Sequence, residues 1–165
     1  MAGSNGFGDV ARIAGGIVLV AVVVAVALWA ERATDDDLEL PDRVAGWSQD
    51  DSAEVREFAE ANNDRLSEAY DDADAVTAVY AGDLRVLVTA VRAASGPPVP
   101  AVLGDNQEWV EDGDVVCLVT EPAEGEPSTL CQRDDGDLTV RAYAEGTTDA
   151  DTLVSLTDDV FEEIS

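Results

Sequence analysis

The two cysteines, Cys117 and Cys131, impose the tightest constraint on what this 165-residue chain can fold into. They lie in two segments typical of β-strands, DVVCLVTE at 114–121 and STLCQRD at 128–134, and the turn formers PAEGEP separate these segments. In a hairpin centred on Glu124 the two cysteines lie directly opposite each other, because each is seven residues from that centre. Their Cβ atoms would then be about 4.5–5.5 Å apart, which is close enough for a disulfide to form.

An uncharged run of eighteen residues, IAGGIVLVAVVVAVALWA at 13–30, lies close to the N-terminus. A helix of that length measures about 27 Å, close to the thickness of the hydrocarbon core of a bilayer. Its apolar character continues around the whole helix, whereas a helix on the surface of a globular domain has a polar face. The run therefore predicts a transmembrane anchor. A cleaved signal peptide is the alternative, but the small residues best suited to a peptidase, Ala25 and Ala27, lie inside the apolar run.

The flanking charges orient the predicted anchor. The leader at 1–12 carries the free amino group and Arg12, whereas the far side begins with an acidic spacer at 31–40. The positive-inside rule places the leader in the cytoplasm and the domain at 41–165 outside it, with the lipid bilayer as the partner of 13–30. In that oxidising compartment we expect the two cysteines to form a structural disulfide. Free thiols and a redox-active pair are the alternatives, and the redox pair is disfavoured because the chain has no CxxC spacing.

The chain carries 36 acidic side chains against 9 basic ones, for a formal net charge of -27. This charge repels phosphate backbones, so nucleic acid is not expected among the partners. Histidine is absent, which removes the commonest general base and the commonest metal ligand. Aspartate clusters such as EDGD at 111–114 consist of turn residues and lack the spacing of an EF-hand calcium loop. We therefore expect no catalytic residue, no metal site and no cofactor, and the acid excess itself is consistent with a saline habitat.

Two segments have the periodicity of amphipathic helices. In 51–70, a capping box that begins at Asp51 marks the expected helix start. The face expected to be buried carries Val55, Phe58, Ala59, Leu66, Ala69 and Tyr70. In 147–164, Thr148 or Asp149 is the expected cap. The buried face of this second helix is expected to carry Leu153, Leu156, Val160, Phe161 and Ile164.

The residues between these two helices favour strands. Gly82-Asp83 predicts a two-residue hairpin turn that pairs Val79 with Val86. The cysteine hairpin and a strand at 138–144 (LTVRAYA) follow further along the chain. The order of elements predicts an α+β domain, in which an antiparallel sheet of about five strands is packed with two helices. The predicted transmembrane helix precedes this domain.

The segment 93–113 has no periodicity and contains GPPVP. Loops of this length are uncommon in compact domains and often carry binding sites. Trp109, which lies in this segment, is the first candidate for a surface contact. Trp47, at the end of LPDRVAGW, is the second candidate, although packing over the core explains a tryptophan there better.

The entry segment LPDRVAGW is followed by a helix, strands, two late cysteines and a closing helix. This layout resembles small membrane-anchored or secreted proteins of unknown function from actinobacteria. The helix-flanked antiparallel sheet is also similar to that of lipoproteins with the Mog1/PsbP-like fold. Those lipoproteins carry a lipidated cysteine after the signal, and no cysteine occupies that place here. The resemblance therefore implies a fold and no functional residue.

These features together predict a single-pass membrane protein that displays a disulfide-closed domain outside the cytoplasm. We expect the domain to be non-catalytic and to bind another envelope protein or a small ligand. One alternative is a secreted acidic hydrolase that uses a carboxylate pair, which two acids buried in one cleft with raised pKa values would favour. The other alternative is a scaffold subunit that assembles a membrane complex through its apolar helix, with Gly15 and Gly16 at the interface.

Overall fold

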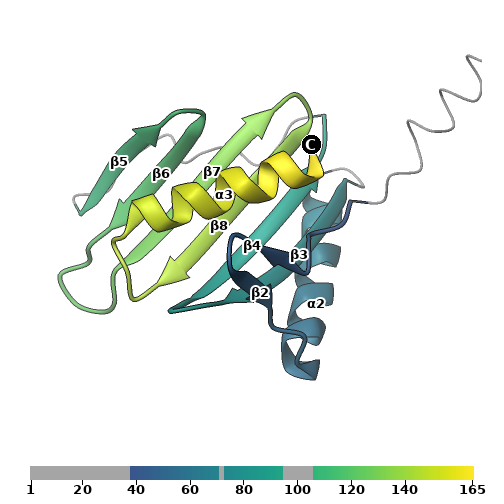
Figure 1. The fold of residues 1–165 in the computed structure, drawn as a ribbon, viewed down its shortest axis with the longest axis horizontal. Coiled ribbons are helices and arrows are strands. Elements are labelled where there is room, and N and C mark those ends of the chain that lie inside the picture. The colour runs from purple at the N-terminus through teal and green to yellow at the C-terminus, as the bar shows by residue number, and fades with distance from the viewer. Residues whose placement is uncertain (1–37, 71–72, 95–105) are drawn as a thin grey trace, which may run out of the picture. The chain divides into compact units, whose positions relative to one another are not determined.

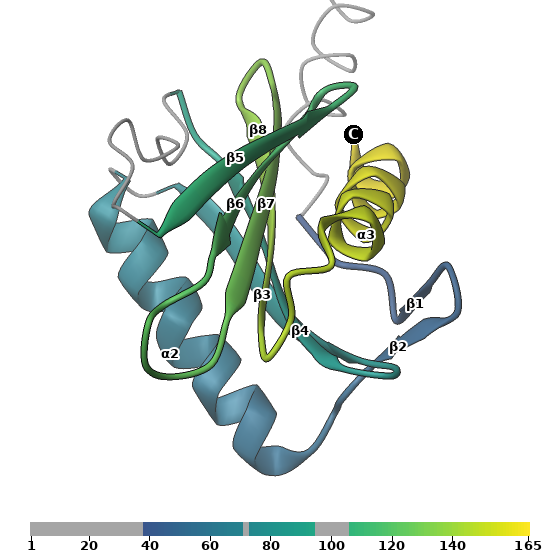
Figure 2. The ribbon, with the colours of Figure 1, turned by 90° about the vertical axis from the view of Figure 1, so that its left-hand side faces the viewer.

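In the computed structural model, which describes residues 38–70, 73–94 and 106–165, eight strands form one antiparallel sheet and two helices pack on it (Figure 1). The strands lie in the order β1-β2-β3-β4-β8-β7-β6-β5. Their bounds are β1 Arg43–Val44, β2 Trp47–Gln49, β3 Asp74–Ala81, β4 Arg85–Arg92, β5 Gln107–Asp112, β6 Val115–Thr120, β7 Ser128–Asp135 and β8 Leu138–Glu145. The helices are α2, Ala53–Ala69, and α3, Ala150–Ile164, and they lie on opposite faces of the sheet (Figure 2).

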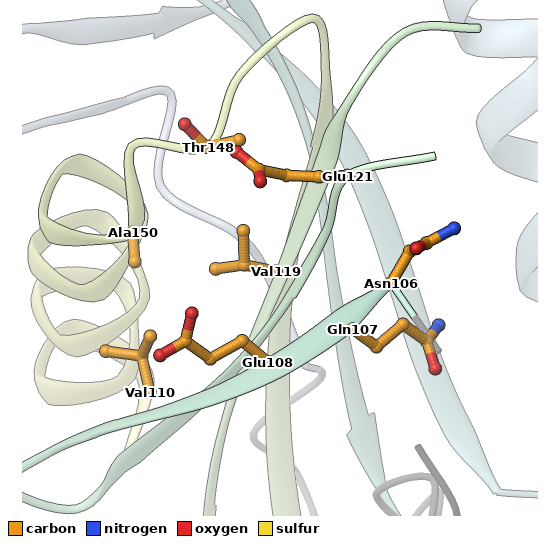
Figure 3. Close-up of a pocket in the computed structure, with 8 residues that line it drawn as sticks. All are labelled: Asn106, Gln107, Glu108, Val110, Val119, Glu121, Thr148 and Ala150. Atoms are coloured by element: carbon orange, nitrogen blue, oxygen red, sulfur yellow. The ribbon is translucent and has the colours of Figure 1, made fainter. Parts of the chain in front are cut away.

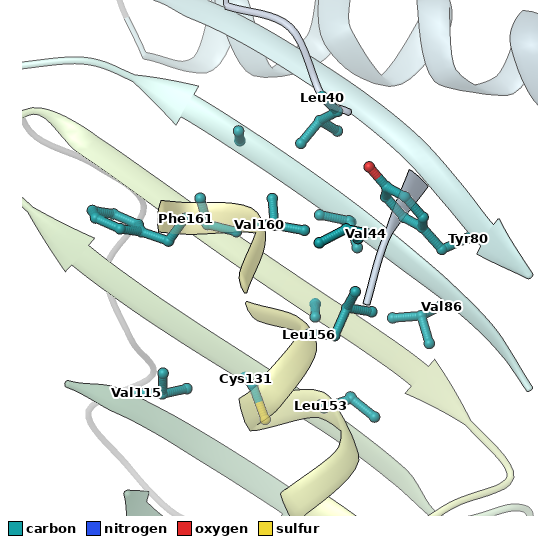
Figure 4. Packing of buried hydrophobic residues seen from close by; sticks show 14 of the residues in the cluster. Leu40, Val44, Tyr80, Val86, Val115, Cys131, Leu153, Leu156, Val160 and Phe161 are labelled. Carbon is teal, nitrogen blue, oxygen red and sulfur yellow. The ribbon is translucent and has the colours of Figure 1, made fainter. Parts of the chain in front are cut away.

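The hydrophobic core lies between α3 and the sheet (Figure 4). Leu153, Leu156, Val160 and Phe161 recur at helical spacing along α3 and are all buried, as the sequence predicts. Asp149 is the N-cap of α3, and its side chain accepts a hydrogen bond from the Thr152 backbone N–H at 3.2 Å. Alternate residues of the strands complete the core, including Tyr80, Val86, Val88, Cys117, Cys131, Val140 and Ala142.

The cysteine hairpin has the predicted register. Cys117 on β6 pairs directly with Cys131 on β7, and the two residues form a disulfide with their Cα atoms 4.0 Å apart. Both cysteines are fully buried on the α3 side of the sheet. The disulfide therefore joins the two strands in the middle of the half of the sheet that is built from β5, β6, β7 and β8.

The first hairpin differs from the predicted register by one residue. Val79 pairs with Leu87 instead of Val86, because the loop between β3 and β4 has three residues instead of two. A shift of one residue moves every side chain of a strand to the other face. The loop is packed against β2, where a Cβ on Gly82 would lie 2.8 Å from the Trp47 ring atoms Cε3 and Cζ3. The three-residue loop between β3 and β4, which local residue preferences do not predict, is thus in contact with Trp47, a residue distant in the sequence.

The predicted fold class is wrong in the number of strands. The sheet has eight strands instead of about five, because β1, β2 and β5 were not expected. The first two are too short to show a periodic pattern, and β5 lies within the segment expected to be a loop. The predicted membrane-spanning helix at 13–30 lies outside the described residues, and neither described helix is long and apolar enough to cross a membrane.

The first described residues, 38–41, pack against the core. Leu38 and Leu40 are buried, although both fall within the predicted spacer. The Tyr80 hydroxyl donates a hydrogen bond to the Pro41 carbonyl oxygen at 2.5 Å. Burial of this phenol raises the pKa of Tyr80 to about 12. The folded unit therefore includes residues 38–40.

Helix α2 is more exposed than its periodicity predicts. Among its residues only Val55 is buried, and Phe58 keeps 46% of its surface exposed. Ser52 is the N-cap in place of Asp51, and no side-chain hydrogen bond caps the helix. Asn62 donates to the Thr77 hydroxyl at 2.9 Å, which ties the helix to β3. The helix thus covers the β3 side of the sheet and leaves much of its own apolar face exposed.

Candidate functional site

The two faces of the sheet differ in how completely they are covered. Helix α3 packs on β6, β7, β8 and β1 on one face, whereas α2 packs chiefly on β3 on the other face (Figure 2). We call the second face the α2 face. Because side chains alternate along a strand, every second residue from β4 to β5 points to the α2 face. Among the described residues, the α2 face is therefore the less covered of the two.

Six apolar side chains form a continuous row across the α2 face. Each lies directly opposite the next on the neighbouring strand, from β3 through β4, β8, β7 and β6 to β5. We call this set the apolar row, and its members in spatial order are Val79, Leu87, Tyr143, Leu130, Leu118 and Trp109. Leu118 is buried and the other five are half-buried. Directly opposite residues have Cβ atoms about 5 Å apart, so the row is one apolar surface.

Next to α2 the apolar row borders a hollow of about 380 Å³. The exposed ring of Phe58 lines this hollow together with three members of the row, Val79, Leu87 and Tyr143. Arg85 and Glu145 add one charge of each sign at its rim. An exposed aromatic ring beside half-buried apolar side chains favours a contact with another molecule.

A partly buried polar network borders the apolar row on the same face. Gln132 donates to the Asp134 carboxylate at 2.7 Å, and the Thr139 hydroxyl donates to the other oxygen of that carboxylate at 2.6 Å. The Arg141 Nε donates to the Gln132 side-chain oxygen at 2.5 Å, and burial lowers the pKa of Arg141. Because these side chains hydrogen-bond to one another, the network holds β7 and β8 in place and needs no ligand to satisfy it.

The two tryptophans expected at a contact surface lie far apart in the order of the sheet. Trp109 belongs to β5, where it ends the apolar row and remains half-buried. Trp47 belongs to β2 and packs against the core. Of the predicted loop at 93–113, residues 107–112 form β5, and residues 95–105 lie outside the described residues. Trp109 is therefore presented by an edge strand instead of a loop.

A second hollow, of about 480 Å³, lies on the other face between β5 and the start of α3 (Figure 3). The side chains of Glu108 on β5 and Glu121 after β6 both reach this space, and Thr148 borders it. The carboxylate of Asp149 already caps the nearby end of α3. The two glutamate carboxylates make the region beside β5 negative, and none of the described residues that line the hollow is basic.

The resolved pKa shifts of carboxyl groups come from local hydrogen bonds. The pKa of Asp50 is lowered, first by a hydrogen bond from the Ser52 backbone, and the pKa of Asp149 is lowered chiefly by the Thr152 side chain. Neither shift is the upward one that a carboxylate pair in a hydrolase would need. Within 38–70, 73–94 and 106–165, no three side chains of the kinds that bind metals lie close enough together to hold an ion.

Comparison with known proteins leaves the chain without an assigned relative. No protein family, no curated protein and no solved structure matches it. The resemblance to lipoproteins with the Mog1/PsbP-like fold therefore stays a prediction.

The apolar row and the exposure of Phe58 were not predicted from the sequence. Alternation along each strand is visible in the sequence, but the row exists only when six strands align, and the wrong first register would have placed Val79 opposite Val86. The periodicity of α2 predicts that Phe58 is buried. No signal in the sequence indicates that the helix lies over β3 and leaves that ring exposed.

Proposed function

We propose that the described domain is a non-catalytic binding module that works outside the cytoplasm and binds another protein of the cell envelope through the apolar row. The observation that carries the proposal is the alignment of six apolar side chains on the less covered face of the sheet. The buried disulfide supports the location, because such bonds persist in oxidising compartments. Attachment to the cell membrane through residues 13–30 stays a prediction of the sequence, which membrane fractionation tests.

The dimensions of the row favour a protein over a small ligand. Neighbouring strands lie about 4.8 Å apart, so a row across six strands extends roughly 24 Å. A small ligand would cover one end of such a surface, whereas a protein chain can cover its full length. The half-buried state of five of its members leaves apolar area for a partner to cover.

Site-specific photo-crosslinking in cells that naturally produce the protein tests this proposal. A photoreactive side chain is placed in the full-length chain at Leu87, Leu130 or Trp109, and at Ser155 as a control. Ser155 is exposed, and so more accessible than the three positions of the row, but it lies on α3, on the other side of the sheet. We expect one adduct of the same mass from all three positions of the row and none from the control. Absence of an adduct from the row, or an equal yield from Ser155, would refute the proposal.

A variant in which two members of the apolar row are made polar provides a second test of the proposal. Leu87→Gln combined with Leu130→Gln places two amides on the α2 face and leaves the core beneath α3 unchanged. We expect the crosslink from Trp109 to be lost while the thermal unfolding transition of the domain stays cooperative. Retention of the crosslink in a folded variant would show that the row does not carry the contact.

A further inference from the structure

The outer edge of β5 is the longer of the two edges of the sheet. β5 has six residues and, within the described part of the chain, pairs with β6, while no described strand pairs with the outer side of its Trp109 and Glu111. The opposite edge, β1, has two residues and contacts α3. An edge strand presents a row of backbone N–H and C=O groups to which another strand can pair. β5 is therefore the place where the sheet can be extended.

The hydrogen-bond pattern shows which residues present these groups. The Glu121 backbone N–H donates to the Asn106 carbonyl at 2.9 Å, so this pair is a hydrogen-bonded one. Alternation along the ladder then makes Val110 and Cys117 another hydrogen-bonded pair and leaves Trp109 with its backbone groups on the outer side. The Cα separation of 4.0 Å between Cys117 and Cys131 agrees, because non-bonded antiparallel pairs are the closer ones. The outer side thus presents the backbone of Trp109 and, two residues later, that of Glu111.

The charges along the outer edge of β5 indicate what kind of strand could pair with it. Glu108, Glu111 and Asp112 are exposed on β5, and Glu121 and Glu108 both line the second hollow (Figure 3). A second copy of β5 would place three more carboxylates along the same seam, and like charges on paired strands destabilise the pair. A strand with Lys or Arg at the corresponding positions would instead gain attraction. The edge therefore disfavours a second copy of this chain and favours a basic strand.

The apolar row indicates which residue type an added strand should have opposite Trp109. A residue opposite Trp109 on an added strand would point to the α2 face and extend the apolar row by one strand. The residue opposite Glu111 would point to the same face, and the residue opposite Glu108 would point to the other face. The best partner therefore has an apolar side chain opposite Trp109 and basic side chains opposite Glu108 and Glu111.

We propose that β5 accepts an extended basic segment of the partner protein, which adds to the sheet as a further strand beside Trp109. The proposal rests on the proposed function, because it specifies how the same surface takes up a protein partner. Strand addition supplies backbone hydrogen bonds for affinity and alternate side-chain contacts for specificity.

A designed peptide of six residues, acetyl-Arg-Lys-Val-Tyr-Arg-Thr-amide, serves as the probe. In antiparallel pairing with Asp112 to Gln107, its tyrosine lies opposite Trp109, and basic residues lie opposite Glu111 and Glu108. Binding to the full-length chain is measured by NMR titration, and hydrogen exchange of the β5 amides is measured with and without the peptide. We expect slower exchange at the Trp109 and Glu111 amides. A peptide with the same side chains and N-methylated backbone amides should lose binding about tenfold or more, because it keeps the charges but not the ability to pair.

Matched variants separate strand pairing from general attraction to an acidic protein. Glu108→Gln with Glu111→Gln should weaken peptide binding about tenfold. Glu57→Gln with Glu60→Gln makes the same change in net charge on exposed positions of α2 and should have little effect. Glu111→Pro removes an outward N–H without removing a bond to β6, and it should weaken binding more than Glu111→Gln does.

Three results would overturn the inference: equal binding of the N-methylated peptide, unchanged exchange at Trp109 and Glu111, or equal losses in the two double variants. If the edge fails in this way while crosslinks from Leu87 and Leu130 persist in cells, the apolar row binds its partner without strand addition. If those crosslinks are absent as well, both proposals are wrong.

Discussion

Reduction of the Cys117–Cys131 disulfide is expected to lower the free energy of unfolding by about 3 kcal/mol at 25 °C. The bond joins residues that are 14 positions apart and so closes a short loop in the unfolded chain. In the chain-entropy treatment, a loop of about 15 residues restricts the unfolded state by about 3 kcal/mol. Small domains are stable by about 5–15 kcal/mol in total, so this single bond accounts for a fifth or more of the stability.

Urea unfolding of the full-length chain, followed by circular dichroism with and without a phosphine reductant, measures this loss. The matched control is the double variant C117A/C131A, whose midpoint should not respond to the reductant. We also expect a larger dependence of the free energy on urea concentration after reduction, because the unfolded chain without the cross-link exposes more surface. A loss below about 1 kcal/mol, or an equal response to reductant in the double variant, would refute the reasoning.

Three further predictions concern stability. Gly82→Ala should cost about 1–3 kcal/mol because its Cβ would lie 2.8 Å from the Trp47 ring, and Trp47→Leu in the same chain should reduce that cost in a double-mutant cycle of urea unfolding. Asp149→Ala should cost about 1 kcal/mol at pH 7. Since folding lowers the pKa of this carboxyl, its contribution should be complete above its unfolded pKa of about 3.9 and vanish as the pH falls through the folded value, so wild-type and variant stabilities should converge in acid. Tyr80→Phe should cost about 1 kcal/mol, because it removes one of the two hydrogen bonds to the Pro41 carbonyl oxygen and leaves the one that the Gln49 side chain donates at 3.0 Å. Burial also raises the pKa of Tyr143, so both proteins should lose stability at high pH. Since folding raises the pKa of Tyr80 to about 12, the wild type should lose more than the variant between about pH 10 and 12, which unfolding curves across that range would show.

Some features of this protein follow from the sequence because their causes are local. The symmetric placement of Cys117 and Cys131 about a turn predicts their pairing, and the structure confirms it. The amphipathic period of α3 and its cap at Asp149 are confirmed for the same reason, since spacing along a helix is set by its own geometry.

Other features arise only when distant segments meet. The register of the first hairpin accompanies the contact of Gly82 with Trp47, and β5 becomes a strand beside β6 although its sequence, QEWVED, is mostly polar. The apolar row depends on five registers at once, so no single strand reveals it. Periodicity states which residues share one face of an element, whereas the neighbours that cover that face are set by tertiary packing. For this reason the sequence identified Trp109 as a contact residue, but only the folded sheet placed it at the end of an apolar row on an acidic edge.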